Sequence, residues 1–317
     1  TEKSTDAGIF QLNYKMSYLC QFRKEGIMNF EHDLAKFARE MMVDAGVKVS
    51  ENWDDCYTCI KYLELCHRWF DSSVPYIVVF SKELQRKIPL LTKNERLALQ
   101  DIIHRMKNCL SITLYMSKDI KETEIKKSDF FLKNWNIYHL HLEKRIVKKR
   151  FSNNNLLFFQ PKGQVVHMID IKKHPKGAAW FDRELIEIVY NNWPWLLHYI
   201  PNSKVIGAIE DSKVHNELKQ TVVLIPFKNG TLFPTNLGVA SSGDSGLAVR
   251  GAYDILNRLK QCEICLNDEE EKIRKEIYES TSIQVNEQLD YTLIIEEGFF
   301  VAYEKHTNSK IKLFEAK

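Results

Sequence analysis

The sequence lacks any apolar run long enough to span a bilayer, and no signal-peptide pattern follows Thr1. It also lacks internal repeats and low-complexity tracts, and only 12 of its 317 residues are glycine. Its 44% hydrophobic and 27% charged residues are typical of an ordinary globular protein. We therefore expect a cytoplasmic protein without a membrane partner, large enough for about two domains.

Net charge is also small. The formal charge is +3, and a charge of this size does not by itself require a nucleic-acid partner. Any argument for nucleic-acid binding must therefore rest on local clusters of basic residues.

The cysteines are too few and too far apart in the sequence to form a disulfide framework. Seven cysteines are an odd number in a large, intracellular-type chain, which argues against a disulfide framework. Two CxxC pairs occur, Cys56/Cys59 and Cys262/Cys265, but they are far apart in the sequence and both fall in helix-like segments. Cys262 follows Ile255 and Leu259 on an apolar face, where a free cysteine is a small core residue. We expect neither a structural zinc ion nor any other cofactor.

The pattern of apolar residues predicts an α+β fold in three parts. Residues 1–128 are mainly helical, and a boundary is expected in the charged segment Lys118–Lys127. Residues 129–200 predict a small mixed sheet with a flanking helix, in which Leu156–Phe159 is apolar on both faces, as a central strand would be. Residues 201–317 predict an α+β region that ends in three antiparallel strands, Tyr291–Glu296, Phe299–Glu304 and Lys310–Phe314. Asn94 is the expected N-cap of a helix through Leu110.

Histidines and cations gather in residues 134–195. His139 and His141 alternate with apolar residues, as in a strand with two different faces, so their Cα atoms lie roughly 6.6 Å apart on one face. His167 falls in a later predicted strand and His174 in the loop after it. A basic run follows the first strand and consists of Lys144, Arg145, Lys148, Lys149 and Arg150.

Three interpretations of this stretch are open. In the first, imidazoles act as general acid and base, and the cations hold a phosphodiester and stabilise its developing charge. In the second, His139 and His141 chelate a metal, with His167 or Asp170 completing the shell. In the third, the histidines lie on a solvated strand face and the basic run is a linker.

The same stretch contains, in this order, Arg150, Leu156–Phe159, Val166–Ile171 and His174. This order resembles the end of a RelE-like mRNA interferase. With barnase and the colicin E5/D nucleases (the BECR group), these toxins cleave RNA without a metal. The resemblance implies that Arg150 binds the scissile phosphate and that His174 is the acid or base. His139, His141 and His167 are further catalytic candidates because they lie nearby in the sequence.

On these grounds we expect a bacterial, metal-independent endoribonuclease with RNA as its partner. Analogy with the toxins adds a role in phage defence or a toxin–antitoxin pair, and hence an antitoxin or another protein partner. The alternative is a nucleic-acid- or protein-binding module without catalysis, and a metal-dependent nuclease comes third.

One further motif carries less weight. Gly243-Asp244-Ser245-Gly246 spells the nucleophile motif of chymotrypsin-like serine proteases, but a long helix follows at once, and the surroundings lack the turn-dense β pattern of those enzymes. We expect Ser241, Ser242 and Ser245 to cap the helix and the glycines to form the turn.

Overall fold

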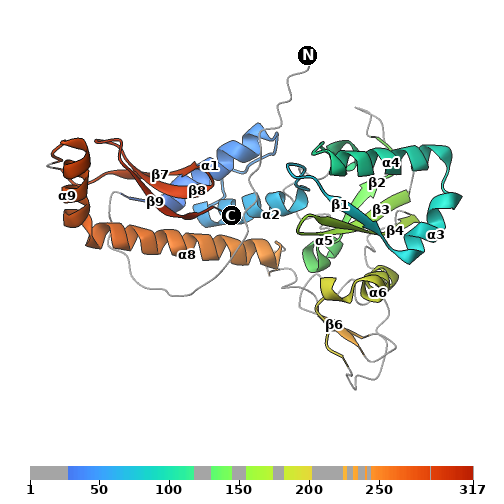
Figure 1. The fold of residues 1–317 in the computed structure, drawn as a ribbon. Coiled ribbons are helices and arrows are strands. Elements are labelled where there is room, and N and C mark those ends of the chain that lie inside the picture. The colour runs from blue at the N-terminus through green and yellow to red at the C-terminus, as the bar shows by residue number, and fades with distance from the viewer. Residues whose placement is uncertain are drawn as a thin grey trace, which may run out of the picture. The chain divides into compact units, whose positions relative to one another are not determined.

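The structure is a computed structural model, and it describes residues 28–117, 130–144, 155–173, 182–201, 224–226, 231–234, 240, 244–285 and 287–316. These residues contain eight α-helices and nine β-strands, and the strands form three sheets (Figure 1). This confirms the α+β class. The chain divides into two compact units, residues 1–67 with 248–317, and residues 68–247. The three-part division at 128 and 200 stays a prediction, and the boundary segment Lys118–Lys127 lies outside the described residues.

The first unit joins the two ends of the chain. Its elements are α1 (Phe30–Asp44), α2 (Asp55–Arg68), α8 (Gly246–Asp268), α9 (Glu270–Thr281), β7 (Tyr291–Glu296), β8 (Phe299–Glu304) and β9 (Lys310–Glu315). The strands form an antiparallel sheet in the order β7-β8-β9, as the sequence predicted. Leu34, Leu63, Ile255 and Phe300 belong to one core, which explains why segments from both ends of the chain fold together.

The second unit contains the stretch that the sequence singles out. Its elements are β1 (Ile77–Phe80), α3 (Lys82–Lys87), η1 (Ile88–Leu90), α4 (Lys93–Lys107), η2 (Thr113–Tyr115), α5 (Phe130–Trp135), β2 (Tyr138–His141), β3 (Asn155–Lys162), β4 (Val165–Lys173), α6 (Arg183–Asn192), η5 (Pro194–Leu196), β5 (Leu224–Pro226) and β6 (Leu232–Pro234).

The four-stranded sheet of this unit has the order β1-β4-β3-β2. β1 is parallel to β4, and β3 is antiparallel to both of its neighbours, β4 and β2. It follows that β1, β2 and β4 run in one direction and end at the same edge of the sheet. We call this the carboxyl edge. β3 begins at this edge with Asn155.

Helices cover both faces of this sheet, because β3 is apolar on both sides. Leu157 and Phe159 face a core that includes Leu99 and Ile102 of α4, whereas Leu156 and Phe158 face a core that includes residues of α6. Figure 1 shows α4 and α6 on opposite sides of the strands. A strand buried on both faces reads as a continuous apolar run, which is how the sequence predicted a central strand here.

The predicted start of α4 is wrong by two residues. The N-cap is Thr92, not Asn94, and α4 ends at Lys107 rather than at Leu110. The Thr92 side chain accepts a hydrogen bond from Glu95 N, and the Glu95 carboxylate accepts one from Thr92 N at 2.9 Å. This reciprocal capping box satisfies two backbone donors, whereas a single asparagine cap satisfies one.

Candidate functional site

His141 stands at the carboxyl edge, at the end of β2. Its strand partner is Leu156, and the next partner along the same row is Lys172 of β4. The adjacent row is Leu142, Asn155 and Lys173, because Leu142 N donates to Asn155 O at 3.2 Å and Asn155 pairs with Lys173. His141 and Lys172 therefore belong to the face that α6 covers, and Lys173 belongs to the face that α4 covers.

His139 and His141 lie together, as the alternation predicted. Their ring centroids are 6.5 Å apart, and the His139 ring also lies 6.1 Å from that of Phe158. His139 is half-buried, and the His141 residue is only 8% exposed. The pair is thus held by packing against the sheet face rather than displayed on a solvated strand.

His167 lies elsewhere in the sheet. It pairs with Gln160 toward the start of β4, so β3 separates it from the His139/His141 pair. Its Nδ1 donates to Gln160 O at 3.2 Å, and its ring packs 4.9 Å from Trp193. Burial lowers the pKa of His167, although the Gln160 carbonyl opposes the shift. These contacts give His167 a packing role, and a catalytic role for it stays a prediction.

Most of the predicted phosphate-binding residues cannot be placed. Arg145, Lys148, Lys149 and Arg150 lie outside the described residues, and so does His174. Lys144 is described: its Nζ lies 3.2 Å from Oδ2 of Asp101 on α4.

Asp101 is the centre of a cluster on α4 that the sequence analysis missed. Its Oδ2 accepts hydrogen bonds from Tyr115 Oη at 2.6 Å and from Arg105 Nε at 2.8 Å, in addition to the Lys144 contact. Burial opposes ionisation, but the hydrogen bonds from Tyr115, Arg105 and Lys144 outweigh it and lower the pKa of Asp101 to about 2. Asp101 is therefore an anion at any neutral pH.

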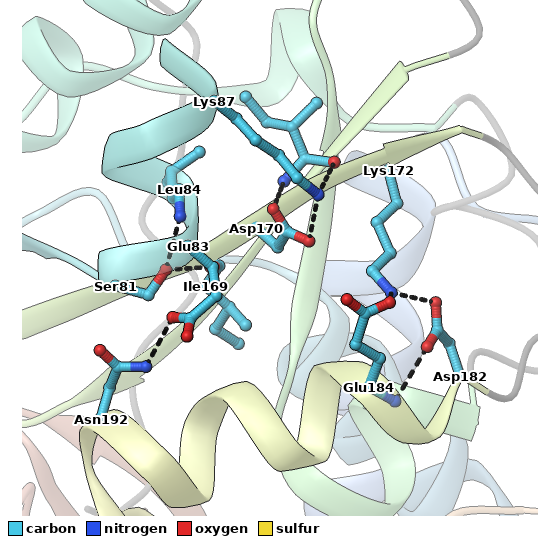
Figure 2. Close-up of polar contacts among 11 residues, drawn as sticks. Ser81, Glu83, Leu84, Lys87, Ile169, Asp170, Lys172, Asp182, Glu184 and Asn192 are labelled. Atoms are coloured by element: carbon cyan, nitrogen blue, oxygen red, sulfur yellow. Dashed lines mark hydrogen bonds and ion pairs between the residues drawn. The ribbon is translucent and has the colours of Figure 1, made fainter.

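A second missed cluster lies where β1 and β4 end (Figure 2). Asp170 is fully buried; its Oδ2 is 2.7 Å from Lys87 Nζ, and its Oδ1 accepts a hydrogen bond from Ile171 N. Asp170 directly follows Ile169, the residue that a bulge in the pairing with β3 leaves without a partner. Ser81 Oγ donates to Ile169 O and caps α3, so α3 and its cation are fixed to β4.

Lys172 connects β4 to the start of α6. Its Nζ lies 2.7 Å from Asp182 Oδ2 and 2.5 Å from Glu184 Oε2 (Figure 2). Burial alone would lower the pKa of Lys172, but the hydrogen bonds to the two carboxylates outweigh it and raise that pKa. The hydrogen bond from Lys172 in turn lowers the pKa of Glu184. Asp182 is the N-cap of α6, so Lys172 stabilises the helix start as well.

The described residues offer little support for a metal site. They contain no group of three or more His, Cys, Asp or Glu side chains placed to hold a metal ion. Asp170, the carboxylate considered as a ligand beside the histidines, is bonded to Lys87. Cys59 is buried and burial raises the pKa of its thiol, while Cys262 packs against the core of the first unit, as predicted.

Ser245 is buried, as is Asp244. Gly243 lies outside the described residues, and so do Ser241 and Ser242, for which caps were predicted. A nucleophile must reach its substrate, so the burial of Ser245 agrees with a structural loop.

In the part of the chain that the structure describes, no helix combines the length and the apolar character needed to cross a membrane. Comparisons with protein-family models, with curated proteins and with solved structures gave no match.

Proposed function

We propose that this protein is a metal-independent endoribonuclease whose reaction uses the histidine pair at the carboxyl edge. The observation that carries the proposal is the pairing of His139 and His141, with ring centroids 6.5 Å apart, directly before the basic run that starts at Lys144. General acid–base catalysis requires each imidazole to lie within a hydrogen bond of about 2.6–3.2 Å of the proton it transfers, and two neighbouring rings can meet this requirement at one phosphodiester. The resemblance to RelE-like toxins is a second, independent support.

The chemistry needs two proton carriers. One neutral imidazole takes the proton of a ribose 2′-hydroxyl, whose oxygen then attacks phosphorus. The bond from phosphorus to the 5′-oxygen breaks, and a protonated imidazole gives its proton to that leaving oxygen. The products are a 2′,3′-cyclic phosphate and a 5′-hydroxyl. Histidine suits both steps because it titrates near neutral pH.

The cations of the basic run after Lys144, from Arg145 to Arg150, serve a different purpose. They bind the phosphates on either side of the scissile bond and stabilise the charge that develops on phosphorus. The resemblance assigns the contact with the scissile phosphate to Arg150 and makes His174 a further acid or base. A toxin role, with an antitoxin as partner, rests on the resemblance alone.

One observation favours the alternative, a nucleic-acid-binding module without catalysis. The His141 residue is only 8% exposed, and a side chain so covered has a packing role whether or not it transfers protons. In this alternative the same edge binds phosphates, and His139 and His141 only shape it.

Cleavage of labelled RNA in the presence of chelator distinguishes the two functions. His139→Gln and His141→Gln are expected to lose activity by roughly 10²–10⁴-fold, which is what general acid–base catalysis contributes. Binding is measured on an uncleavable 2′-deoxy analogue and is expected to change little. His198→Gln is the matched control, because His198 is exposed and follows η5, whose carbonyls bind Gln160 and Lys162 at the end of β3 opposite the carboxyl edge.

Thermal unfolding of each variant separates a loss of chemistry from a loss of fold. If the wild type binds RNA but cleaves neither single-stranded nor structured RNA, the enzyme is ruled out and the binding module remains. If activity disappears with chelator and returns with a divalent metal, the metal-dependent alternative replaces both.

A further inference from the structure

Two lysines near the carboxyl edge differ in what they contact. The ammonium of Lys144 is 3.2 Å from Asp101 Oδ2, an oxygen that Tyr115 and Arg105 also bind. Lys173, the last residue of β4, is exposed and makes no ion pair or side-chain hydrogen bond with any other described residue.

Lys173 lies at the same edge of the sheet as His141, although on the opposite face. It pairs with Asn155, whose carbonyl oxygen binds Leu142 N, and Leu142 directly follows His141. Neighbouring strands lie about 4.8 Å apart, so the backbones of Lys173 and Leu142 are separated by roughly 10 Å. Lys173 faces the α4 side of the sheet and His141 the α6 side, so an RNA strand that contacts both must cross the carboxyl edge.

The surroundings of Lys144 instead assign it a structural role. Asn155 Nδ2 donates to Glu95 Oε1 at 2.5 Å, so α4 holds Asn155 through Glu95 and Lys144 through Asp101. Through these two contacts one helix, α4, holds Lys144 and Asn155, the described residues on either side of residues 145–154. An ammonium must leave its carboxylate before it binds a phosphate, so a paired lysine gains less from RNA than an unpaired one.

We propose that Lys173 contacts an RNA phosphate at the carboxyl edge, whereas Lys144 is a tether held by the positioning residue Asp101. This inference rests on the proposed function, because it assigns roles within the same RNA site. It adds a binding residue outside the basic run and removes one from within it.

The salt dependence of RNA binding tests the assignment. The probe is a single-stranded, 2′-deoxy-substituted RNA oligonucleotide that cannot be cleaved, and log Kd is measured against log salt concentration for the 317-residue chain. Each phosphate contact with a single strand contributes about 0.7 to the slope. Lys173→Gln is expected to reduce the slope by that amount, and Lys173→Arg to restore it. Lys144→Gln is the matched neutral variant, and its slope is expected to equal that of the wild type while its Tm falls.

Asp101→Asn supplies the converse test. It releases Lys144 and is expected to steepen the slope by about 0.7, since one more ammonium is then available to phosphate. The assignment is overturned if Lys173→Gln leaves the slope unchanged, if Lys144→Gln reduces it as much as Lys173→Gln does, or if Asp101→Asn has no effect on it. A wild-type protein with no RNA affinity overturns the proposed function itself, and the roles of both lysines with it.

Discussion

Replacing Lys87 with methionine removes the cation that faces the fully buried carboxylate of Asp170. The Nζ–Oδ2 distance is 2.7 Å, and among the described residues Asp170 then keeps only the hydrogen bond from Ile171 N. Breaking a buried ion pair by removing one partner costs about 3–5 kcal/mol. The Lys87 side chain is 42% exposed, so water partly screens the pair. We therefore expect a loss of about 2–3 kcal/mol in the free energy of unfolding of the second unit.

Urea unfolding followed by tryptophan fluorescence measures this loss, because five of the six tryptophans of the sequence lie in residues 68–247. Lys312→Met is the control: Lys312 lies in the first unit and its partner Glu297 is 75% exposed, so the change is expected to alter the free energy of unfolding of the second unit by less than about 1 kcal/mol. Lys87→Met combined with Asp170→Leu is expected to be more stable than Lys87→Met alone, since no buried charge is left without a partner. Equal losses for Lys87→Met and Lys312→Met would refute the reasoning.

Two further predictions concern stability. Glu304 of β8 is buried, and hydrogen bonds from Thr307 and from backbone amides outweigh desolvation and lower its pKa. A carboxylate with a lowered pKa contributes stability that is present above the ordinary glutamate pKa and is lost as pH falls below it. Glu304→Gln is therefore expected to weaken the dependence of Tm on pH below about pH 4.5. An unchanged dependence of Tm on pH contradicts this role of Glu304. Thr92→Ala removes the N-cap of α4 and is expected to lower the free energy of unfolding in urea by about 1 kcal/mol. Asn94→Ala, inside the helix, is expected to lower it by less. A larger loss for Asn94→Ala than for Thr92→Ala contradicts the assigned cap.

Strands were predicted correctly where the local pattern of apolar, polar and turn residues determines them. The bounds of β7 and β8 follow from alternation and turn residues, and β3 was predicted as a central strand from its continuous apolar run. The shared face of His139 and His141 follows from the two-residue period of a strand. The error at Asn94 arose because Thr92 and Glu95 form a capping box, which a search for a single cap residue overlooks.

The unpredicted features depend on contacts between distant parts of the sequence. Ile77 of β1 pairs with Val165 of β4, and nothing in either segment encodes that partnership. The Lys87–Asp170 pair follows from it, because the parallel pairing brings α3 beside the end of β4. Burial of His141 was likewise unpredictable, since an alternating strand shows that two faces differ but not which helix covers one of them.

The pH dependence of RNA cleavage in the presence of chelator tests the central claim most directly. The rate constant of the wild type is measured between pH 5 and 9 on a single-stranded RNA, alongside His141→Gln. If one imidazole accepts a proton while another donates one, the wild-type profile is bell-shaped, and His141→Gln loses roughly 10²–10⁴-fold in rate at the optimum. Cleavage that rises steadily with pH, or that His141→Gln leaves intact, contradicts proton transfer by this histidine pair.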